Sequence, residues 1–107
     1  LPAWPIFRTG LSGRGGEARG GVMSYLADNA ITFAAGASLG VEVATSEMTI
    51  NYLRPAHGRS LTAHAVLVFA GRNQAACRCD VYIDDEALGR RLCAIAQGTV
   101  VRVARPR

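Results

Sequence analysis

The chain of 107 residues contains no lysine, and all twelve of its basic residues are arginine, which leaves a formal net charge of +4. Arginine carries a planar guanidinium that suits phosphate groups, so anionic ligands are open to such a protein. A GC-rich codon bias also replaces lysine by arginine and enriches alanine and glycine. We favour this explanation for the arginine content as a whole, and weigh individual arginines by their positions.

Long apolar runs are also missing. No run of about 18 uninterrupted apolar residues occurs, and the glycine- and arginine-rich start lacks the apolar run of a signal peptide. We therefore expect a cytoplasmic protein with no membrane partner. The few aromatic residues are not interleaved with a basic strip, so we expect no nucleic-acid partner. The chain begins at Leu1 rather than at a methionine, which is consistent with a piece of a slightly longer product.

Cysteine and histidine are too few and too scattered to indicate a metal site. The three cysteines are Cys77, Cys79 and Cys93, and neither a second cysteine pair nor a histidine at ligand spacing accompanies them. We expect reduced core thiols rather than a disulfide or a metal site. His57 and His64 lack a cysteine or carboxylate partner at a suitable spacing, so we assign neither a role.

A glycine pair, Gly20-Gly21, opens a long apolar segment. Residues 22–35 are rich in alanine, leucine and methionine and include a single carboxylate, Asp28. We predict a helix over about residues 20–37, and because it is apolar on nearly every side we expect other structure to enclose it. Aspartate is rarely buried without a reason, so Asp28 is the first candidate for chemistry.

Beyond this helix the pattern changes from helical to alternating. We predict four strands, over residues 45–53, 61–70, 74–83 and 91–103. Their connections of about three to six residues are too short for parallel crossovers, so we expect the strands to pair as an antiparallel meander. In the last strand we expect Gly98 to mark a bulge or a bend.

The predicted elements indicate one α+β domain that spans residues 1–107. One apolar helix and one long antiparallel sheet favour a fold in which the sheet wraps around the helix. Residues 1–18 hold prolines and a cluster of glycine, arginine and serine, and we expect an irregular lead-in with at most one short strand. A domain this small buries a limited share of its surface, which makes pairing with a second copy plausible.

The start of the predicted helix suits the binding of a carbonyl. A helix N-terminus presents unpaired N–H groups and partial positive charge, and glycine lets a ligand approach the backbone closely. Asp28 lies two turns beyond Gly21 on the same face, roughly 10 Å along the axis. Thr32, one turn further, is placed to orient the carboxylate or a water. From the residues alone, a catalytic acid and a satisfied structural acid both remain open.

The segment Gly20–Ala30 resembles the glycine-pair-to-acid helix of hot-dog-fold acyl-CoA thioesterases, most closely the phenylacetate-degradation and 4-hydroxyphenylacetyl-CoA type. Residues 47–56 resemble that family's first long strand, residues 71–72 a turn, and residues 96–99 the last strand. These matches keep their order and spacing over about residues 14–103. The resemblance implies a hot-dog fold and hydrolysis of a CoA thioester that carries an aryl or medium-length acyl group.

The resemblance also implies roles for particular residues. Asp28 corresponds to the family's nucleophile or general base, and the N–H of Gly21 to the donor that holds the oxyanion. Thr45 corresponds to a hydroxyl that helps to position the attacking water, and Thr32 to a hydroxyl one turn past the acid. The residues expected to contact the substrate are Arg19, Gly20, Asn29, Arg54 and Arg72. Coenzyme A enters as part of the substrate, so no separate cofactor is expected.

Two positions depart from the family pattern. Arg19 stands where members usually have a histidine before the glycine pair, and Gly13 stands where many have an asparagine or glutamine that holds the thioester. An arginine there is able to replace the histidine in part or to turn toward the CoA phosphates. These departures bear on the rate and on substrate preference more than on the type of reaction.

Three functions follow from the resemblance. The leading one is an acyl-CoA thioesterase that acts as a dimer or a dimer of dimers, with its sites at the subunit interface. The second is a non-catalytic hot-dog module that binds acyl-CoA. The third is a hot-dog dehydratase, which usually pairs a histidine with the acid, and the position of His57 and His64 outside the helix region counts against it.

Overall fold

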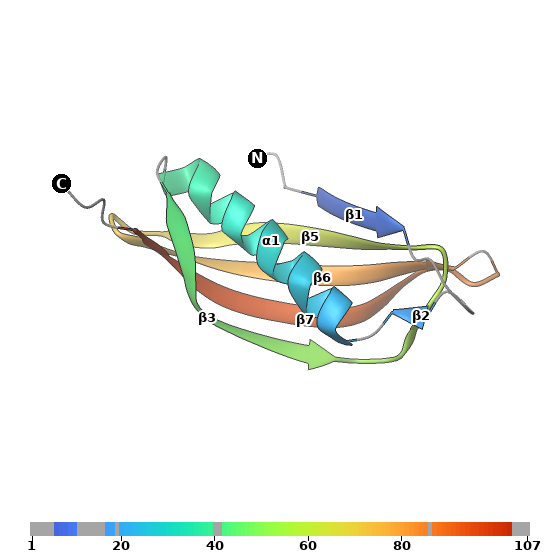
Figure 1. Ribbon diagram of the computed structural model, residues 1–107. Helices are drawn as coiled ribbons and strands as arrows, with labels where there is room; N and C mark the ends of the chain where they lie inside the picture. The colour runs from blue at the N-terminus through green and yellow to red at the C-terminus, as the bar shows by residue number, and fades with distance from the viewer. Residues whose placement is uncertain (1–5, 11–16, 19, 40–41, 86, 104–107) are drawn as a thin grey trace.

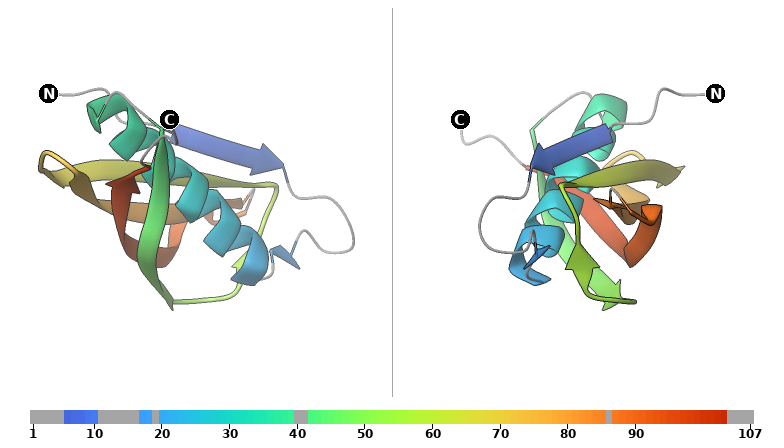
Figure 2. Two further views of the ribbon diagram at one scale, coloured as in Figure 1. Left: turned by 60° about the vertical axis from the view of Figure 1, so that its left-hand side comes forward. Right: turned by 90° about the vertical axis from the view of Figure 1, so that its right-hand side faces the viewer.

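The computed structural model describes residues 6–10, 17–18, 20–39, 42–85 and 87–103. One long helix lies across one face of a curved antiparallel sheet (Figure 1). The elements in chain order are β1 (Ile6–Gly10), β2 (Glu17–Ala18), α1 (Gly20–Leu39), β3 (Val43–Tyr52), β4 (Ala56–His57), β5 (Ser60–Ala70), β6 (Gln74–Asp85) and β7 (Gly89–Arg102). The predicted α+β fold with a sheet wrapped around one helix is therefore confirmed, and Figure 2 shows the sheet curling around α1.

Only one side of α1 is covered by the sheet. Its buried side chains recur at helical spacing and are Met23, Leu26, Ala27, Ala30, Ile31, Ala34 and Ala35. On the other side, Val22, Tyr25 and Phe33 are 41%, 70% and 60% exposed. The apolar pattern predicted a helix enclosed on all sides. In a single copy of the chain, only the side that faces the sheet is buried.

The order of strands in the main sheet is β1-β5-β6-β7-β3. The predicted meander holds for β5, β6 and β7, but β3 pairs with β7 and not with β5, so that part of the prediction is wrong. The chain between β3 and β5 carries β4, which pairs with β2, and it crosses from one edge of the sheet toward the other (Figure 1). A connection of this kind separates strands that are neighbours in the sequence.

The first residues are more regular than the expected lead-in with at most one short strand. In the described parts of this segment, residues 6–10 and 17–18, the structure has two strands, because β1 pairs with β5 along one edge of the main sheet and β2 pairs with β4. Both partners lie far along the chain. Long-range backbone pairing, rather than local propensity, decides the conformation of such short segments.

Small side chains form the face of the sheet that meets α1. The predicted inward set of β6, Cys77, Cys79, Val81 and Ile83, is buried as expected. Around it lie alanines that leave room for the helix, at positions 63, 65, 75, 94 and 96, all of them buried. Because these side chains are short, the backbone of α1 lies close to the sheet, and its alanines pack into the same interface.

A β-bulge lies in β3 and not at Gly98. Gly98 pairs regularly with Met48, whereas the register shifts between Thr45 and Glu47, where Ser46 is the extra residue. The expectation of a bulge at Gly98 is therefore wrong, and the bulge occupies the facing strand. Its effect is a change of phase, because Thr45 and Met48 are half-buried while Ser46 and Glu47 between them are exposed.

The buried cysteines generate a prediction about thiol chemistry. Burial raises the pKa of Cys79 to about 12, with the Asp80 carboxylate and Cys77 adding to the shift, and burial also raises the pKa of Cys77 and of Cys93. Since the thiolate is the reactive form, we expect native protein at pH 8 to leave a thiol-capture reagent unconsumed. Protein unfolded in urea should react at all three cysteines.

The same shifts predict how stability depends on alkaline pH. A raised pKa means that the folded state disfavours the thiolate of Cys79. The contribution of the neutral Cys79 thiol to the free energy of unfolding is therefore complete below the ordinary pKa of 9.0 and is lost as the pH rises toward about 12. Urea unfolding should therefore show a falling free energy of unfolding across this range, with a shallower fall for Cys79→Ala. Equal slopes for the two proteins would contradict the assignment to Cys79.

Candidate active site

Asp28 lies in the middle of α1, at the border between its covered and its open side, and is half-buried. The first part of β3 runs beside α1 (Figure 1). Its residue Thr45 reaches the helix at this turn. Thr45 Oγ1 donates a hydrogen bond of 2.7 Å to Asp28 Oδ1. A bond this short between a hydroxyl and a carboxylate is among the stronger hydrogen bonds in proteins. It fixes the orientation of the carboxylate.

Thr32 lies one turn beyond Asp28 and completes a group of three side chains. Its Oγ1 donates to the backbone carbonyl of Asp28 at 2.7 Å and lies 3.2 Å from Thr45 Oγ1. Each hydroxyl has a single proton to donate. The two shortest contacts use both protons, which leaves the contact between the two threonines as packing. Thr32 therefore supports Thr45, and Asp28 Oδ1 is held mainly by Thr45.

The β3 bulge explains why Thr45 reaches the helix. In an unbroken strand Thr45 would share the outward side of Glu47, two residues on. The extra residue Ser46 turns Thr45 to the helix side, and Ser46 Oγ donates to the carbonyl of Thr99 on β7 at 3.2 Å. The alternating pattern of the sequence does not reveal this phase change. The contact between Thr45 and Asp28 could thus be expected from the family resemblance but not from periodicity.

Gly21 is the second residue of α1 and lies in open surroundings. No described neighbour comes within 4 Å of the place that its Cβ would occupy. The first turn of the helix also carries no acidic residue that would compete for its N–H groups. A carbonyl can therefore approach this end of the helix without obstruction.

Gly21 and Asp28 of one chain are too far apart to act on one carbonyl. Seven residues of helix separate them, a rise of about 10 Å along the axis. Both face the side of α1 that the sheet leaves open. The two features needed to attack a carbonyl and to stabilise its oxygen are present, but a single copy does not bring them together.

The other candidate residues do not lie together in the structure. Gly20 begins α1, and Asn29 is half-buried beside Asp28. Arg54 is exposed just past β3, where its N–H lies 3.4 Å from the carbonyl of Cys93. Arg19 and Gly13 lie outside the described residues.

Arg72 lies at the far end of the molecule from the start of α1. It is exposed in the turn between β5 and β6, and its carbonyl accepts a hydrogen bond of 3.3 Å from Arg102 Nη1. Figure 1 shows this turn at the end of the sheet where α1 finishes. Within one chain, Arg72 is therefore far from the start of α1, where Gly20 and Gly21 lie.

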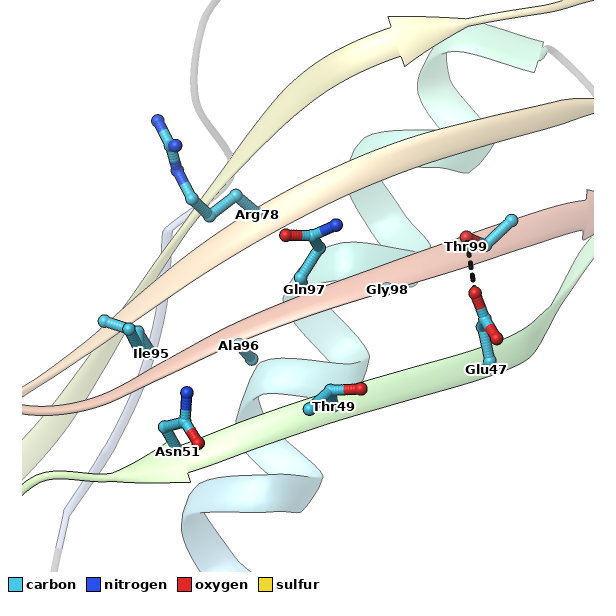
Figure 3. A pocket seen from close by; sticks show the side chains of 9 residues that line it. All are labelled: Glu47, Thr49, Asn51, Arg78, Ile95, Ala96, Gln97, Gly98 and Thr99. Carbon is cyan, nitrogen blue, oxygen red and sulfur yellow. Dashed lines mark hydrogen bonds between the residues drawn. The ribbon is translucent and has the colours of Figure 1, made fainter.

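A hollow of about 320 Å³ lies on the outer face of the sheet, opposite the helix (Figure 3). Its polar side chains are Glu47, Thr49, Asn51, Arg78, Gln97 and Thr99. The helix lies behind the sheet in this view, so the hollow is separated from Asp28. Sequence reasoning missed it, because alternation shows which side chains face outward but not where they leave space.

Two further observations concern metal ions and membranes. Among the described residues, no group of three or more histidine, cysteine, aspartate or glutamate side chains is placed to hold a metal ion. In the same part of the chain, no helix combines the length and the apolar character that crossing a membrane requires.

Comparison with solved structures shows the same fold in bacterial proteins. A thioesterase family protein from Silicibacter pomeroyi superposes with a TM-score of 0.86 at 22% identity, over 97% of this chain and 81% of that one. A Bacillus halodurans protein solved with CoA gives 0.78 at 24% identity, over 91% of this chain and 66% of its own.

An acyl-CoA hydrolase from Staphylococcus aureus, solved in complex with butyryl coenzyme A, gives a TM-score of 0.79 at 19% identity over 95% and 68% of the two chains. Structures of that hydrolase also include variants in which one aspartate, one asparagine or one threonine is replaced by alanine. No curated protein sequence matches this chain significantly. The model of the thioesterase superfamily matches residues 15–90. Because that match covers most of the chain and the solved structures share its architecture, the chain belongs to the thioesterase superfamily and has the hot-dog fold.

Proposed function

We propose that the chain is an acyl-CoA thioesterase with Asp28 as its nucleophile or general base. The observation that carries the proposal is the 2.7 Å hydrogen bond from Thr45 Oγ1 to Asp28 Oδ1. It holds one carboxylate oxygen, while Oδ2 accepts no hydrogen bond from the described residues. A fixed, half-buried carboxylate with one available oxygen suits attack on a carbonyl or removal of a proton from water.

The chemistry has two routes that use the same groups. As a general base, Asp28 takes a proton from water, and the resulting hydroxide attacks the thioester carbon. As a nucleophile, the carboxylate attacks that carbon directly, and water then hydrolyses the mixed anhydride. In both routes the oxyanion is held by the N–H of Gly21 at the start of α1. The C–S bond breaks, and coenzyme A leaves as the thiol together with the free acid.

The site is proposed to form between two copies of the chain. Asp28 and the Gly21 of the same chain are about 10 Å apart along the helix, so the oxyanion donor has to come from a partner. β3 is an edge strand of ten residues, and beside it α1 exposes Val22, Tyr25 and Phe33. Pairing two β3 edges across a two-fold axis would lay two helices side by side in opposite directions. A homotetramer would then be a dimer of such dimers.

The substrate is proposed to be a CoA thioester with an aryl or medium-length acyl group. The Bacillus halodurans protein was solved with CoA, and the Staphylococcus aureus hydrolase with butyryl coenzyme A. Gly20 and Asn29 lie on the helix beside the reacting groups and are proposed to line the acyl pocket. Arg19, Arg54 and Arg72 are proposed to meet the phosphates of CoA, and Arg72 would serve the site of a partner because it lies far from its own helix start.

The alternative is a module that binds acyl-CoA without hydrolysing it. The replacement of the family's usual histidine by Arg19 favours this alternative, because it removes a group near the thioester sulfur. Turnover of a panel of phenylacetyl-, hydroxybenzoyl- and straight-chain acyl-CoAs, followed with a thiol-capture reagent, separates the two functions. No release from any substrate, together with measurable binding of CoA esters, would establish the module.

Replacement of Asp28 by asparagine should lower turnover by about a hundredfold or more, because it removes the base or nucleophile without changing volume. The fold should persist, as measured by circular dichroism and urea unfolding. Asp80→Asn is the matched control, since Asp80 is a half-buried carboxylate on β6, outside the proposed site. A near wild-type rate for Asp28→Asn would show that Asp28 is structural.

The hydrogen bond from Thr45 gives a second prediction. Thr45→Val keeps the shape of the side chain but leaves Asp28 Oδ1 without its donor, so the free energy of unfolding should fall by about 1–3 kcal/mol. Turnover should fall with it, because the carboxylate loses its fixed orientation. Thr45→Ser retains the hydroxyl and should stay close to wild type in both measurements. Equal values for the valine and serine variants would mean that the hydroxyl is unimportant.

Mixing two inactive variants tests whether the site is shared. Asp28→Asn and Gly21→Val each damage every site of their own dimer. In a mixed dimer, one site combines the intact Asp28 of one chain with the intact Gly21 of the other. After unfolding and refolding an equimolar mixture, about a quarter of wild-type turnover should return, since half of the dimers are mixed and each has one intact site of two. No recovery, with native mass spectrometry showing that mixed dimers form, would place the whole site within one chain.

A further inference from the structure

At Gly98 the sheet, the helix and the edge strand meet with no room for a side chain. This buried residue of β7 pairs with Met48 of β3. A Cβ atom placed on it would lie 3.3 Å from the carbonyl oxygen of Glu47 and 3.4 Å from both Cδ1 and Cγ2 of Ile31. Carbon atoms in good contact are about 3.5–4.0 Å apart, so an added methyl group would have to move its neighbours.

Both neighbours are held by the surrounding structure. Ile31 is fully buried on the side of α1 that faces the sheet. The Glu47 carbonyl belongs to the backbone of β3, where Glu47 is registered opposite Thr99 of β7. Close-packed interiors pass such a displacement on to the segments that carry the displaced groups.

Both displaced segments carry the candidate active site. Ile31 lies on α1 between Asp28 and Thr32, and Glu47 follows Thr45 across the β3 bulge. A group inserted at position 98 would therefore act on both partners of the 2.7 Å bond between Asp28 and Thr45. The missing side chain allows the helix and the edge strand to approach closely enough for that bond.

We propose that Gly98 is a positioning residue, which sets the hydrogen bond from Thr45 to Asp28 by letting α1 and β3 approach over β7. The geometric part of the proposal stands on the contacts of Gly98, and its effect on rate rests on the proposed thioesterase activity. The glycine at position 98 therefore allows α1 and β3 to approach each other closely, rather than allowing β7 to bend.

The first test is the kinetics of Gly98→Ala. A shift of a few tenths of an ångström in the Asp28 or Thr45 segment should lower kcat about tenfold, given that a misplacement of 1 Å costs about a hundredfold. KM for the acyl-CoA should stay unchanged, since the open side of the helix is untouched. Gly36→Ala is the matched control, because a Cβ there would lie at an ordinary 3.6 Å from Val43 Cγ2. Its kcat should stay within about twofold of wild type.

The second test is rescue by a smaller neighbour. Ile31→Val removes Cδ1, one of the two Ile31 atoms that crowd position 98. Combined with Gly98→Ala it should restore most of the lost kcat, while Ile31→Val alone should leave kcat near wild type. If Gly98→Ala alone does not fold, the double variant carries the test. A double variant with kcat as low as that of Gly98→Ala, or lower, would overturn the proposal.

The third test does not depend on activity. A double-mutant cycle of Asp28→Asn and Thr45→Val in urea unfolding measures the coupling between these two side chains. This coupling should shrink in the Gly98→Ala background and remain in the Gly36→Ala background. An unchanged coupling would overturn the positioning role, even if kcat falls. If wild-type protein releases no thiol from any acyl-CoA, the proposed function fails while this cycle still decides the role of Gly98.

Discussion

The close approach of one helix to one sheet is the constraint on which the rest of this structure depends. Much of the inner face of the sheet consists of alanines, three cysteines and Gly98, and the facing side of α1 contributes Ala27, Ala30 and Ala34 beside the larger Leu26 and Ile31. Where these small side chains face each other, the two backbones are able to lie near each other, and close packing fixes their relative placement. That fixed placement brings the turn that carries Asp28 beside the first residues of β3. With larger side chains between the helix and the sheet, Asp28 and the first residues of β3 would be too far apart for contact.

The candidate site combines residues of the helix α1 with a residue of the edge strand β3. Thr45 and Thr32 come from different elements, yet their hydroxyl groups lie 3.2 Å apart beside one carboxylate. Asp28 is at the border of the covered side, so Thr45 of the sheet holds one of its oxygens in place, while the other accepts no hydrogen bond from the described residues. The opposite face of the sheet carries a polar hollow of different composition, and the thickness of the sheet keeps the two apart (Figure 3).

Much of the fold could be predicted from the sequence, because its main signals are local. The apolar run after Gly20-Gly21 gave the helix, and alternation in residues 74–83 gave the inward side of β6. The position of β3 beside β7 could not be predicted, since it depends on a crossing connection whose β4 pairs with residues far away. The orientation of Thr45 also escaped prediction from periodicity, because one extra residue in the strand reverses the pattern. For the site, the sequence indicated Asp28, and only the resemblance indicated Thr45, while the crowding around Gly98 needed three-dimensional contacts.

The bulge in β3 has a consequence for the free edge of the sheet. An extra residue interrupts the regular alternation of N–H and C=O groups along a strand, so a chain that pairs with this edge cannot continue in register past Ser46. The regular part of the edge is therefore limited to residues 47–52, about the length of one ordinary strand. Edge strands left uninterrupted are the usual starting points of aggregation. Because β-bulges are one of the devices by which natural sheets blunt their edges, the residue that turns Thr45 toward the helix also shortens the stretch along which another chain can pair.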